Sequence, residues 1–153
     1  MPLEIERKFL VVSDDYKLSA KTVDIRQAYL SIDENMAIRV RVEGIQASIN
    51  IKSKKSDRVS HEFEYVIPLD EAQALIRMCS YPVIEKTRHV VEYESKIWEV
   101  DEFHADNTGL TVAEIELDDE NEAFELPPWL GEEVTADYRY LNSNLAKKSF
   151  GFW

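Results

Sequence analysis

The sequence predicts an α+β domain built on an eight-stranded antiparallel β-barrel, with a charged interior and a few short flanking helices. Apolar and polar residues alternate with a period of two in eight segments, which is the pattern of strands with two different faces. Most of these segments are joined by short connections, so neighbouring strands are expected to run antiparallel. A sheet of eight such strands loses its exposed edges when it closes on itself, and this favours a barrel.

The polar face of each expected strand carries ionisable or amide groups two residues apart, while the opposite face is largely apolar. The expected strands are Pro2–Val12, Asp24–Ile32, Ala37–Glu43, Gln46–Lys54, Ser60–Ile67, Val83–Tyr93, Lys96–Phe103 and Thr111–Leu117. Their polar faces carry, in the same order, Glu4, Glu6 and Lys8; Gln27 and Tyr29; Arg39 and Arg41; Ser48, Asn50 and Lys52; Glu62 and Glu64; Lys86 and Arg88; Glu99 and Asp101; Glu114 and Glu116.

A solvated sheet face gives this pattern in any single strand. Eight strands in succession favour a different interpretation, because arginines alone stand on the third strand and glutamates alone on the fifth and eighth. We expect the polar faces to point into the barrel, where acidic and basic clusters confront each other. The apolar faces then point outward and need a cover of helices, with a second subunit, as in a homodimer, left open.

Two helices are expected beside the strands. Asp70 suits the N-cap of a helix that runs to about Met78, with Ala74, Leu75 and Met78 as its apolar stripe. A final helix is expected over Arg139–Lys148.

The composition excludes several classes of protein. Thirty acidic against 18 basic residues give a net charge of −12, which disfavours general binding to nucleic acid. The longest apolar run, Phe9–Val12, is far shorter than the roughly 20 residues of a membrane span, and no secretory signal is evident. The single cysteine, Cys79, excludes an intrachain disulfide. We therefore expect one domain over residues 1–153, cytoplasmic, with no nucleic-acid or membrane partner.

A charged interior of this kind suits an anionic ligand that carries a divalent metal ion. Carboxylate pairs are hard oxygen ligands for Mg²⁺ or Mn²⁺. The pairs Glu4/Glu6 and Glu114/Glu116 come from opposite ends of the chain and become neighbours in a barrel. Arginines match phosphate oxygens with two parallel hydrogen bonds, and lysines add point charge. The histidines His61, His89 and His104 have no ligand-like spacing, so no zinc site is expected.

These motifs together resemble the CYTH superfamily, the triphosphate tunnel metalloenzymes, and within it the short bacterial tripolyphosphatases. The resemblance runs in order through nearly the whole chain. Its motifs are Glu4–Phe9, Gln27 with Tyr29, Arg39–Arg41, Ile51–Lys52, Glu62–Glu64, Lys86–Arg88, Trp98–Asp101, Ala113–Leu117, and Val134–Asp137 followed by Arg139, Asn142 and Asn144–Ala146.

The resemblance implies a barrel whose tunnel binds a triphosphate with a divalent metal ion. The metal ligands it implies are Glu4, Glu6, Glu114 and Glu116, with Asp101 supporting them or binding a second ion. The phosphate-binding residues it implies are Lys8, Arg39, Arg41, Lys52 and Arg88. Glu62 and Glu64 match an acidic pair of the family, which either ligates metal or fixes the neighbouring basic side chains.

The expected activity is hydrolysis of a phosphoanhydride, with inorganic tripolyphosphate favoured because the chain lacks obvious insertions for an organic group. Mg²⁺ or Mn²⁺ is the expected cofactor, and Ca²⁺ is expected to inhibit. Adenylyl cyclase and thiamine triphosphatase remain alternatives on the same fold, and a polyanion-binding barrel without turnover is a third.

The general base is expected among groups other than histidine, because no histidine stands on the predicted inner face. A carboxylate, a lysine, a tyrosine or metal-bound hydroxide could take the proton of the attacking water. Lys86 and Tyr29 are the pair selected for testing, and simple phosphate binding by Lys86 is the alternative.

Overall fold

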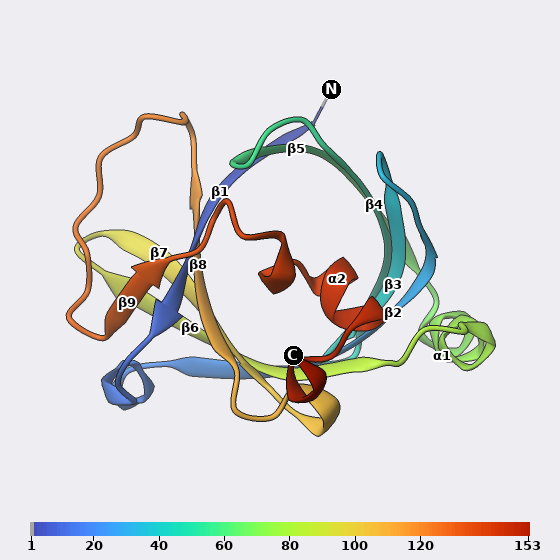
Figure 1. The fold of residues 1–153 in the computed structure, drawn as a ribbon. Coiled ribbons are helices and arrows are strands. Elements are labelled where there is room, and N and C mark those ends of the chain that lie inside the picture. The colour runs from blue at the N-terminus through green and yellow to red at the C-terminus, as the bar shows by residue number, and fades with distance from the viewer. Residues whose placement is uncertain (1) are drawn as a thin grey trace.

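A computed structural model describes residues 2–153 and contains a closed antiparallel barrel of eight strands (Figure 1). The strands are β1 (Leu3–Val11), β2 (Lys21–Ile32), β3 (Ala37–Glu43), β4 (Gln46–Lys54), β5 (Val59–Ile67), β6 (Ile84–Tyr93), β7 (Lys96–Phe103) and β8 (Thr111–Leu117). Their order around the barrel is β5-β4-β3-β2-β6-β7-β8-β1, and pairing of β1 with β5 closes the ring. The predicted fold is confirmed, and four of the strands have the predicted bounds.

A short further strand, β9 (Leu130–Glu133), was not predicted. It pairs with the second half of β1, with Phe9 opposite Glu133 and Val11 opposite Leu130. Four residues are too few to show an alternating pattern. Gly131 permits the approach of the two strands, because a Cβ atom there would lie 2.8 Å from Cγ1 of Val12.

The first helix, α1 (Leu69–Met78), differs from the prediction at its start and in its buried face. It begins at Leu69, with Pro68 as N-cap, and Asp70 lies in its first turn. Ala72 and Ile76 are buried against the barrel, whereas Met78 is exposed. Leu75 packs against the same cluster as predicted, but the buried face is centred on Ala72 and Ile76, because a short helix with several small or apolar residues allows more than one apolar face.

The predicted final helix consists of two shorter elements. A 3-10 turn, η3 (Tyr138–Tyr140), precedes α2 (Asn142–Lys147). Leu141 between them has an extended backbone, with φ −67° and ψ 135°, and this interrupts the helix. Three further 3-10 turns are η1 (Asp15–Leu18), η2 (Ala105–Asn107) and η4 (Phe150–Phe152).

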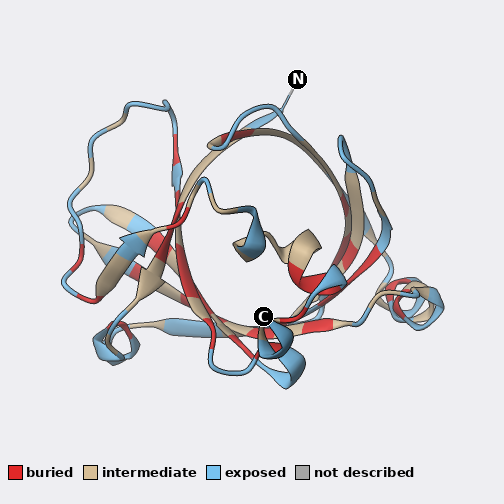
Figure 2. Cartoon of the chain, in the orientation of Figure 1, coloured by how far each residue is buried: buried red, intermediate tan, exposed pale blue. Residues whose placement is uncertain are grey.

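The apolar faces of the strands point outward, and segments of the same chain cover much of them, whereas Tyr65 is exposed. Helix α1 covers one patch that contains Ala28 and Val40. On another side, Phe124 and Trp129 from the segment after β8 pack edge-to-face on Trp98, with ring centroids 5.6 and 5.9 Å away. Much of the barrel wall is accordingly buried or half-buried, but parts of β2 and β5 are exposed, as are most of the connecting loops (Figure 2).

Helix α2 lies within the outline of the barrel when viewed along its axis (Figure 1). Its Leu145 and Ala146 are buried with Tyr29, Ile84 and Phe103. This apolar cluster fills one part of the interior and leaves the rest to polar side chains. None of the helices between residues 2 and 153 is long and apolar enough to cross a membrane.

Candidate active site in the barrel interior

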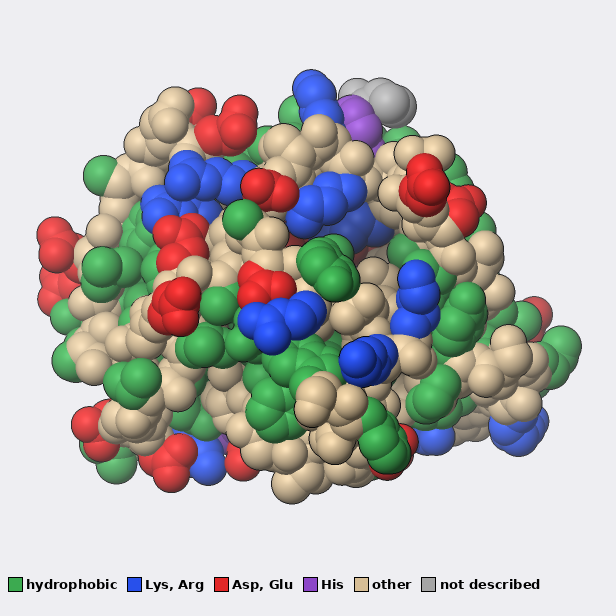
Figure 3. Space-filling view, viewed as in Figure 1, with side chains coloured by type: hydrophobic (Ala, Val, Ile, Leu, Met, Phe, Trp, Pro, Cys, Tyr) green, Lys and Arg blue, Asp and Glu red, His purple; other side chains and the backbone are tan. Residues whose placement is uncertain are grey.

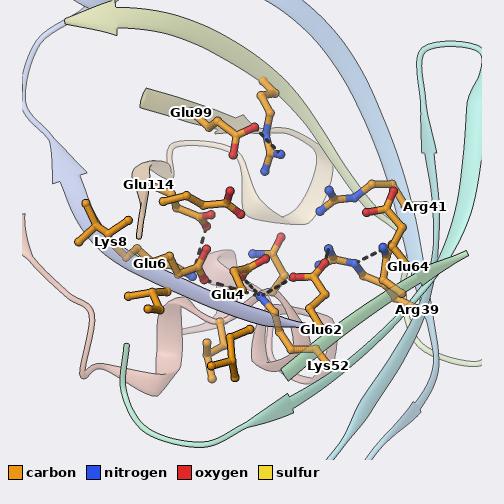
Figure 4. A pocket seen from close by; sticks show the side chains of 18 of the residues that line it. Glu4, Glu6, Lys8, Arg39, Arg41, Lys52, Glu62, Glu64, Glu99 and Glu114 are labelled. Carbon is orange, nitrogen blue, oxygen red and sulfur yellow. Dashed lines mark hydrogen bonds and ion pairs between the residues drawn. The ribbon is translucent and has the colours of Figure 1, made fainter. Parts of the chain in front are cut away.

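The polar faces of the strands enclose a cavity of about 850 Å³ (Figure 4). Thirteen of the fourteen residues selected from the sequence line it: Glu4, Glu6, Lys8, Tyr29, Arg39, Arg41, Lys52, Glu62, Glu64, Lys86, Arg88, Glu114 and Glu116. Lys and Arg side chains also border a recess on the face of the molecule shown in Figure 3. The predicted inward orientation of the charged faces is confirmed.

One side of the cavity is acidic, because β1 and β8 are neighbours. Glu6 lies opposite Glu116 in the strand register, and Lys8 lies opposite Glu114. Burial and a hydrogen bond with Glu62 raise the pKa of Glu4 above its ordinary value. Burial and the charges of Glu4 and Glu6 likewise raise the pKa of Glu116. These carboxylates therefore gather negative charge that a cation would stabilise.

Lys52 from β4 is the cation of the protein nearest to this acidic side. Its Nζ lies 2.7 Å from Glu4, 3.7 Å from Glu6 and 3.8 Å from Glu62. Burial lowers the pKa of Lys52, but the charges of Glu6 and Glu4 outweigh burial and raise it above its ordinary value. Lys52 thus remains charged and partly neutralises the cluster.

The opposite wall is basic and is formed by β3. Arg39 donates a hydrogen bond to Asn50 at 3.4 Å and lies 3.8 Å from Glu62. Arg41 donates from Nε to Gln27 at 3.0 Å and forms no ion pair with any of residues 2–153. Burial, together with the charges of Arg39 and Arg88, lowers the pKa of Arg41 to about 10. The terminal nitrogens of Arg41 are therefore available to an anionic ligand.

A buried carboxylate, Asp101 on β7, holds two further cations. Lys86 lies 2.8 Å from one carboxylate oxygen, and Arg88 donates two hydrogen bonds to the same carboxylate at 2.8 and 3.0 Å. Burial opposes ionisation of Asp101, but the two cations hold its pKa well below the usual range. Burial lowers the pKa of Lys86 to about 7, against the attraction of Asp101 and with the repulsion of Arg88 and Arg41.

Comparison with known proteins identifies the family to which this barrel belongs. The family model of the CYTH domain matches residues 2–150. The chain belongs to the CYTH family. A protein of Acetivibrio thermocellus named inorganic triphosphatase is 46% identical over 98% of this chain and 97% of its own length. A protein of Nitrosomonas europaea with the same name is 35% identical over 94% of this chain and 96% of its own length.

A crystal structure of a similar protein also supports the fold of this CYTH protein. The crystal structure of an inorganic triphosphatase superposes with a TM-score of 0.71 at 33% identity, covering 95% of each chain.

Asp101 is the one selected residue that does not line the cavity of this CYTH protein. Only 1% of its surface is exposed, and both of its oxygens accept hydrogen bonds from Lys86 or Arg88. Its position differs from that expected of a metal ligand, because two cations already occupy its oxygens. Sequence alternation placed Asp101 on the correct face but could not show which groups it contacts.

Lys86 and Tyr29 lie in the same cavity but do not form a hydrogen-bonded pair among the described residues. The ammonium group of Lys86 contacts Asp101 and also donates to Asn142 at 3.0 Å. Tyr29 lies opposite Arg39 in the strand register and packs in the apolar cluster beside α2.

Two residues of the site received no role from the sequence. Glu99 on β7 lies 3.1 Å from Arg88, and burial raises its pKa. Asn142, the first residue of α2, accepts hydrogen bonds from Gln27 and Lys86 at 2.9 and 3.0 Å. The polar pattern of β7 already pointed to Glu99. No local pattern could place Asn142, because it reaches the barrel only through the fold of the C-terminal segment.

The donor set fits a metal ion that binds together with its ligand. Among residues 2–153, no three acidic, histidine or cysteine side chains are gathered closely enough to hold a metal by themselves. Mg²⁺ usually keeps several waters and takes one or two carboxylates together with phosphate oxygens, so a spread set of glutamates suits it. Nine acidic and seven basic residues line the cavity, so a polyanion needs added cations in order to bind there.

Proposed function

We propose that this CYTH protein is a metal-dependent hydrolase that converts inorganic tripolyphosphate into pyrophosphate and phosphate. The observation that carries the proposal is the cavity inside the barrel, in which basic side chains from β3, β4 and β6 face glutamates of β1 and β8. The relatives named inorganic triphosphatase, at 46% and 35% identity over nearly the whole chain, support the same substrate.

The basic residues of the cavity would bind the phosphate groups. This role is assigned to Lys8, Arg39, Arg41, Lys52 and Arg88. Arg41 is the strongest candidate for direct contact, because its terminal nitrogens have no acidic partner among the described residues and its planar group can donate two parallel hydrogen bonds. Arg88 is already held by Asp101 and Glu99, so it would contribute charge from a fixed position.

Glu4, Glu6, Glu114 and Glu116 would hold Mg²⁺ or Mn²⁺ jointly with the substrate. When bound, the ion would neutralise phosphate charge and act as a Lewis acid. The raised pKa values of Glu4 and Glu116 support this assignment, because a bound cation would favour the ionised carboxylates that burial and the neighbouring glutamates disfavour. Glu62 and Glu64 are assigned to the support of Arg39 and Lys52, since Glu62 lies within 3.8 Å of both.

Lys86 is proposed as the general base that takes a proton from the attacking water. A pKa of about 7 leaves a substantial fraction of its amine neutral at physiological pH, which a base requires. Tyr29 would orient the substrate from the cavity wall beside Arg39. Asp101 would fix Lys86 and Arg88 rather than ligate the metal.

An inorganic substrate is favoured by the lining of the cavity. Tyr29 is the only aromatic residue that lines it in the described chain, and this residue packs in the wall. A purine or thiazolium group would be expected to find an aromatic stacking partner.

The proposal is tested by measuring products after incubation with tripolyphosphate and Mg²⁺. One phosphate and one pyrophosphate are expected from each tripolyphosphate, and parallel reactions with ATP and thiamine triphosphate should be slower. A faster reaction with ATP that yields cyclic AMP would overturn the proposal in favour of a cyclase. Binding of tripolyphosphate without phosphate release, with either Mg²⁺ or Mn²⁺, would indicate a binding module.

A further inference from the structure

We infer that Gln27 and Asn142 are positioning residues, whose side-chain amides form a neutral bridge that fixes Arg41 and Lys86 toward the phosphate chain. The inference rests on the proposed hydrolysis and adds to it two residues that touch neither metal nor reacting atoms. Neither amide received a role from the sequence.

The bridge consists of three hydrogen bonds in a row. Arg41 on β3 donates from Nε to Oε1 of Gln27 at 3.0 Å. Gln27 on β2 donates from Nε2 to Oδ1 of Asn142 at 2.9 Å. Lys86 on β6 donates from Nζ to the same oxygen of Asn142 at 3.0 Å. Two cations on different strands are thus linked through two uncharged side chains.

Burial makes each of these bonds necessary. Gln27 is completely buried and Lys86 is 2% exposed, so neither could exchange its partner for bulk water. A buried polar group that loses its partner costs free energy, and the cost is greater when the group is charged. The bridge therefore holds each side chain in one orientation.

The bonds leave free the donors that a phosphate would need. Asp101 and Asn142 take two of the three free positions on the Lys86 nitrogen, and the third is a donor when the group is charged and the proton-accepting lone pair when it is neutral. Gln27 takes only Nε of Arg41, so the two terminal nitrogens of its guanidinium group stay available. These remaining donors belong to residues that line the cavity.

Neutral amides suit this task better than carboxylates. A carboxylate at Gln27 or Asn142 would hold the same cations but would add negative charge to a cavity that already has more acidic than basic residues. An added charge would repel a polyanion, whereas an amide oxygen orients the cations without neutralising them. Preorganised donors of this kind lower the barrier to phosphoryl transfer.

Asn142 reaches this place because α2 is anchored in the barrel. Leu145 and Ala146, on the same helix, are buried with Phe103 and Ile84. The packing of α2 therefore fixes the position of the amide, and through it links the C-terminal segment to two cations of the site.

The decisive experiment is a double-mutant cycle between Asn142→Ala and Lys86→Ala, with hydrolysis of tripolyphosphate as the readout. Alone, Asn142→Ala should lower kcat about 10- to 100-fold, with a much smaller change in KM, since Lys86 is needed for the chemical step. In the Lys86→Ala background its effect on kcat should be much smaller, because the part that passes through Lys86 is already lost and only the arm through Gln27 and Arg41 remains. Equal effects in both backgrounds would overturn the inference.

Asn144→Ala is the matched control, because Asn144 lies on the same helix but its side chain forms no hydrogen bond within residues 2–153. Its kcat should stay at the wild-type value. A control as impaired as Asn142→Ala would show that α2 merely loses stability, and this too would overturn the inference. If Asn142→Ala fails to fold, Asn142→Leu keeps the side-chain volume and replaces it.

A binding measurement separates this inference from the proposed function. Calorimetric titration with tripolyphosphate in Ca²⁺ follows binding without relying on turnover. Gln27→Met should weaken binding about tenfold, because it releases Arg41 while keeping a buried side chain of similar size. Wild-type protein that binds tripolyphosphate but never hydrolyses it would refute only the proposed function. Unchanged affinity of Gln27→Met would refute the bridge.

Discussion

Replacement of Asp101 by asparagine should destabilise the protein strongly, because it removes the buried carboxylate that Lys86 and Arg88 share and leaves Arg88 with Glu99 as its acidic partner. The side chains of Asp101 and Lys86 are 2% and 1% exposed, and that of Arg88 is 9% exposed, so solvent screens these ion pairs little. Removal of one partner from a buried ion pair costs about 3–5 kcal/mol. With a denaturant dependence of about 2 kcal/mol per molar urea, the midpoint of unfolding should fall by about 1.5–2.5 M.

The pH of the measurement follows from the direction of the pKa shift. The pKa of Asp101 is lower in the folded protein than in the unfolded chain. Its stabilising contribution is therefore fully present above its unfolded pKa of about 3.9 and is lost only as the pH falls through the lower folded value. Urea unfolding at pH 7, followed by circular dichroism, captures the whole effect.

The control for this prediction is Asp106→Asn, since Asp106 is exposed on η2. Its urea midpoint should match the wild type. A midpoint of Asp101→Asn within about 0.3 M of the wild type would refute the reasoning, because it would mean a cost well under about 1 kcal/mol. Activity adds a second criterion: excess Mg²⁺ should not restore kcat of Asp101→Asn, and restoration would instead identify Asp101 as a metal ligand.

The other predictions concern the metal, the substrate and the base. Glu114→Gln should lower Mg²⁺ affinity and rate together, and wild-type turnover at limiting Mg²⁺ would contradict its role as a ligand. Ca²⁺ should inhibit hydrolysis of tripolyphosphate in competition with Mg²⁺, because its larger and looser shell would misplace the phosphates; additive activation would be the contrary result. Arg41→Lys should raise KM about tenfold although charge is kept, because two parallel hydrogen bonds are lost, and an unchanged KM would exclude direct contact. The wild-type rate should rise as the pH passes about 7, since only the neutral amine of Lys86 can accept a proton, and Lys86→Ala should lower kcat far more than it raises KM. An unchanged kcat with an intact pH profile would exclude Lys86 as the base.

Much of the fold could be predicted from the sequence, because strand alternation is a local property. The bounds of β3, β4, β7 and β8 agree with the prediction, and the others differ by at most three residues. The short elements were harder to predict from the sequence. A strand of four residues such as β9 shows no period, and Leu141 interrupts the final helix through a backbone angle that its residue type does not dictate.

Most residues of the candidate site could also be predicted from the sequence. Once the charged faces point inward, every charged residue of those faces must lie near the barrel axis, which is why thirteen of the fourteen selected residues line one cavity. The fourteenth, Asp101, lies on the same face but is covered by Lys86 and Arg88. A period of two gives the direction of a side chain and not the length or reach of the side chains around it.

By itself, the sequence determined that this protein is a barrel with acidic and basic strands facing each other, since alternation fixes which side of a strand each residue occupies. Only the tertiary structure decided which of these groups are engaged with one another. Asp101 is bonded to two cations, Lys86 donates a hydrogen bond to Asn142, and Arg41 keeps its terminal nitrogens free. These contacts join strands and a helix that are distant along the chain, and their energies depend on burial, which arises only when the barrel closes and α2 packs into it.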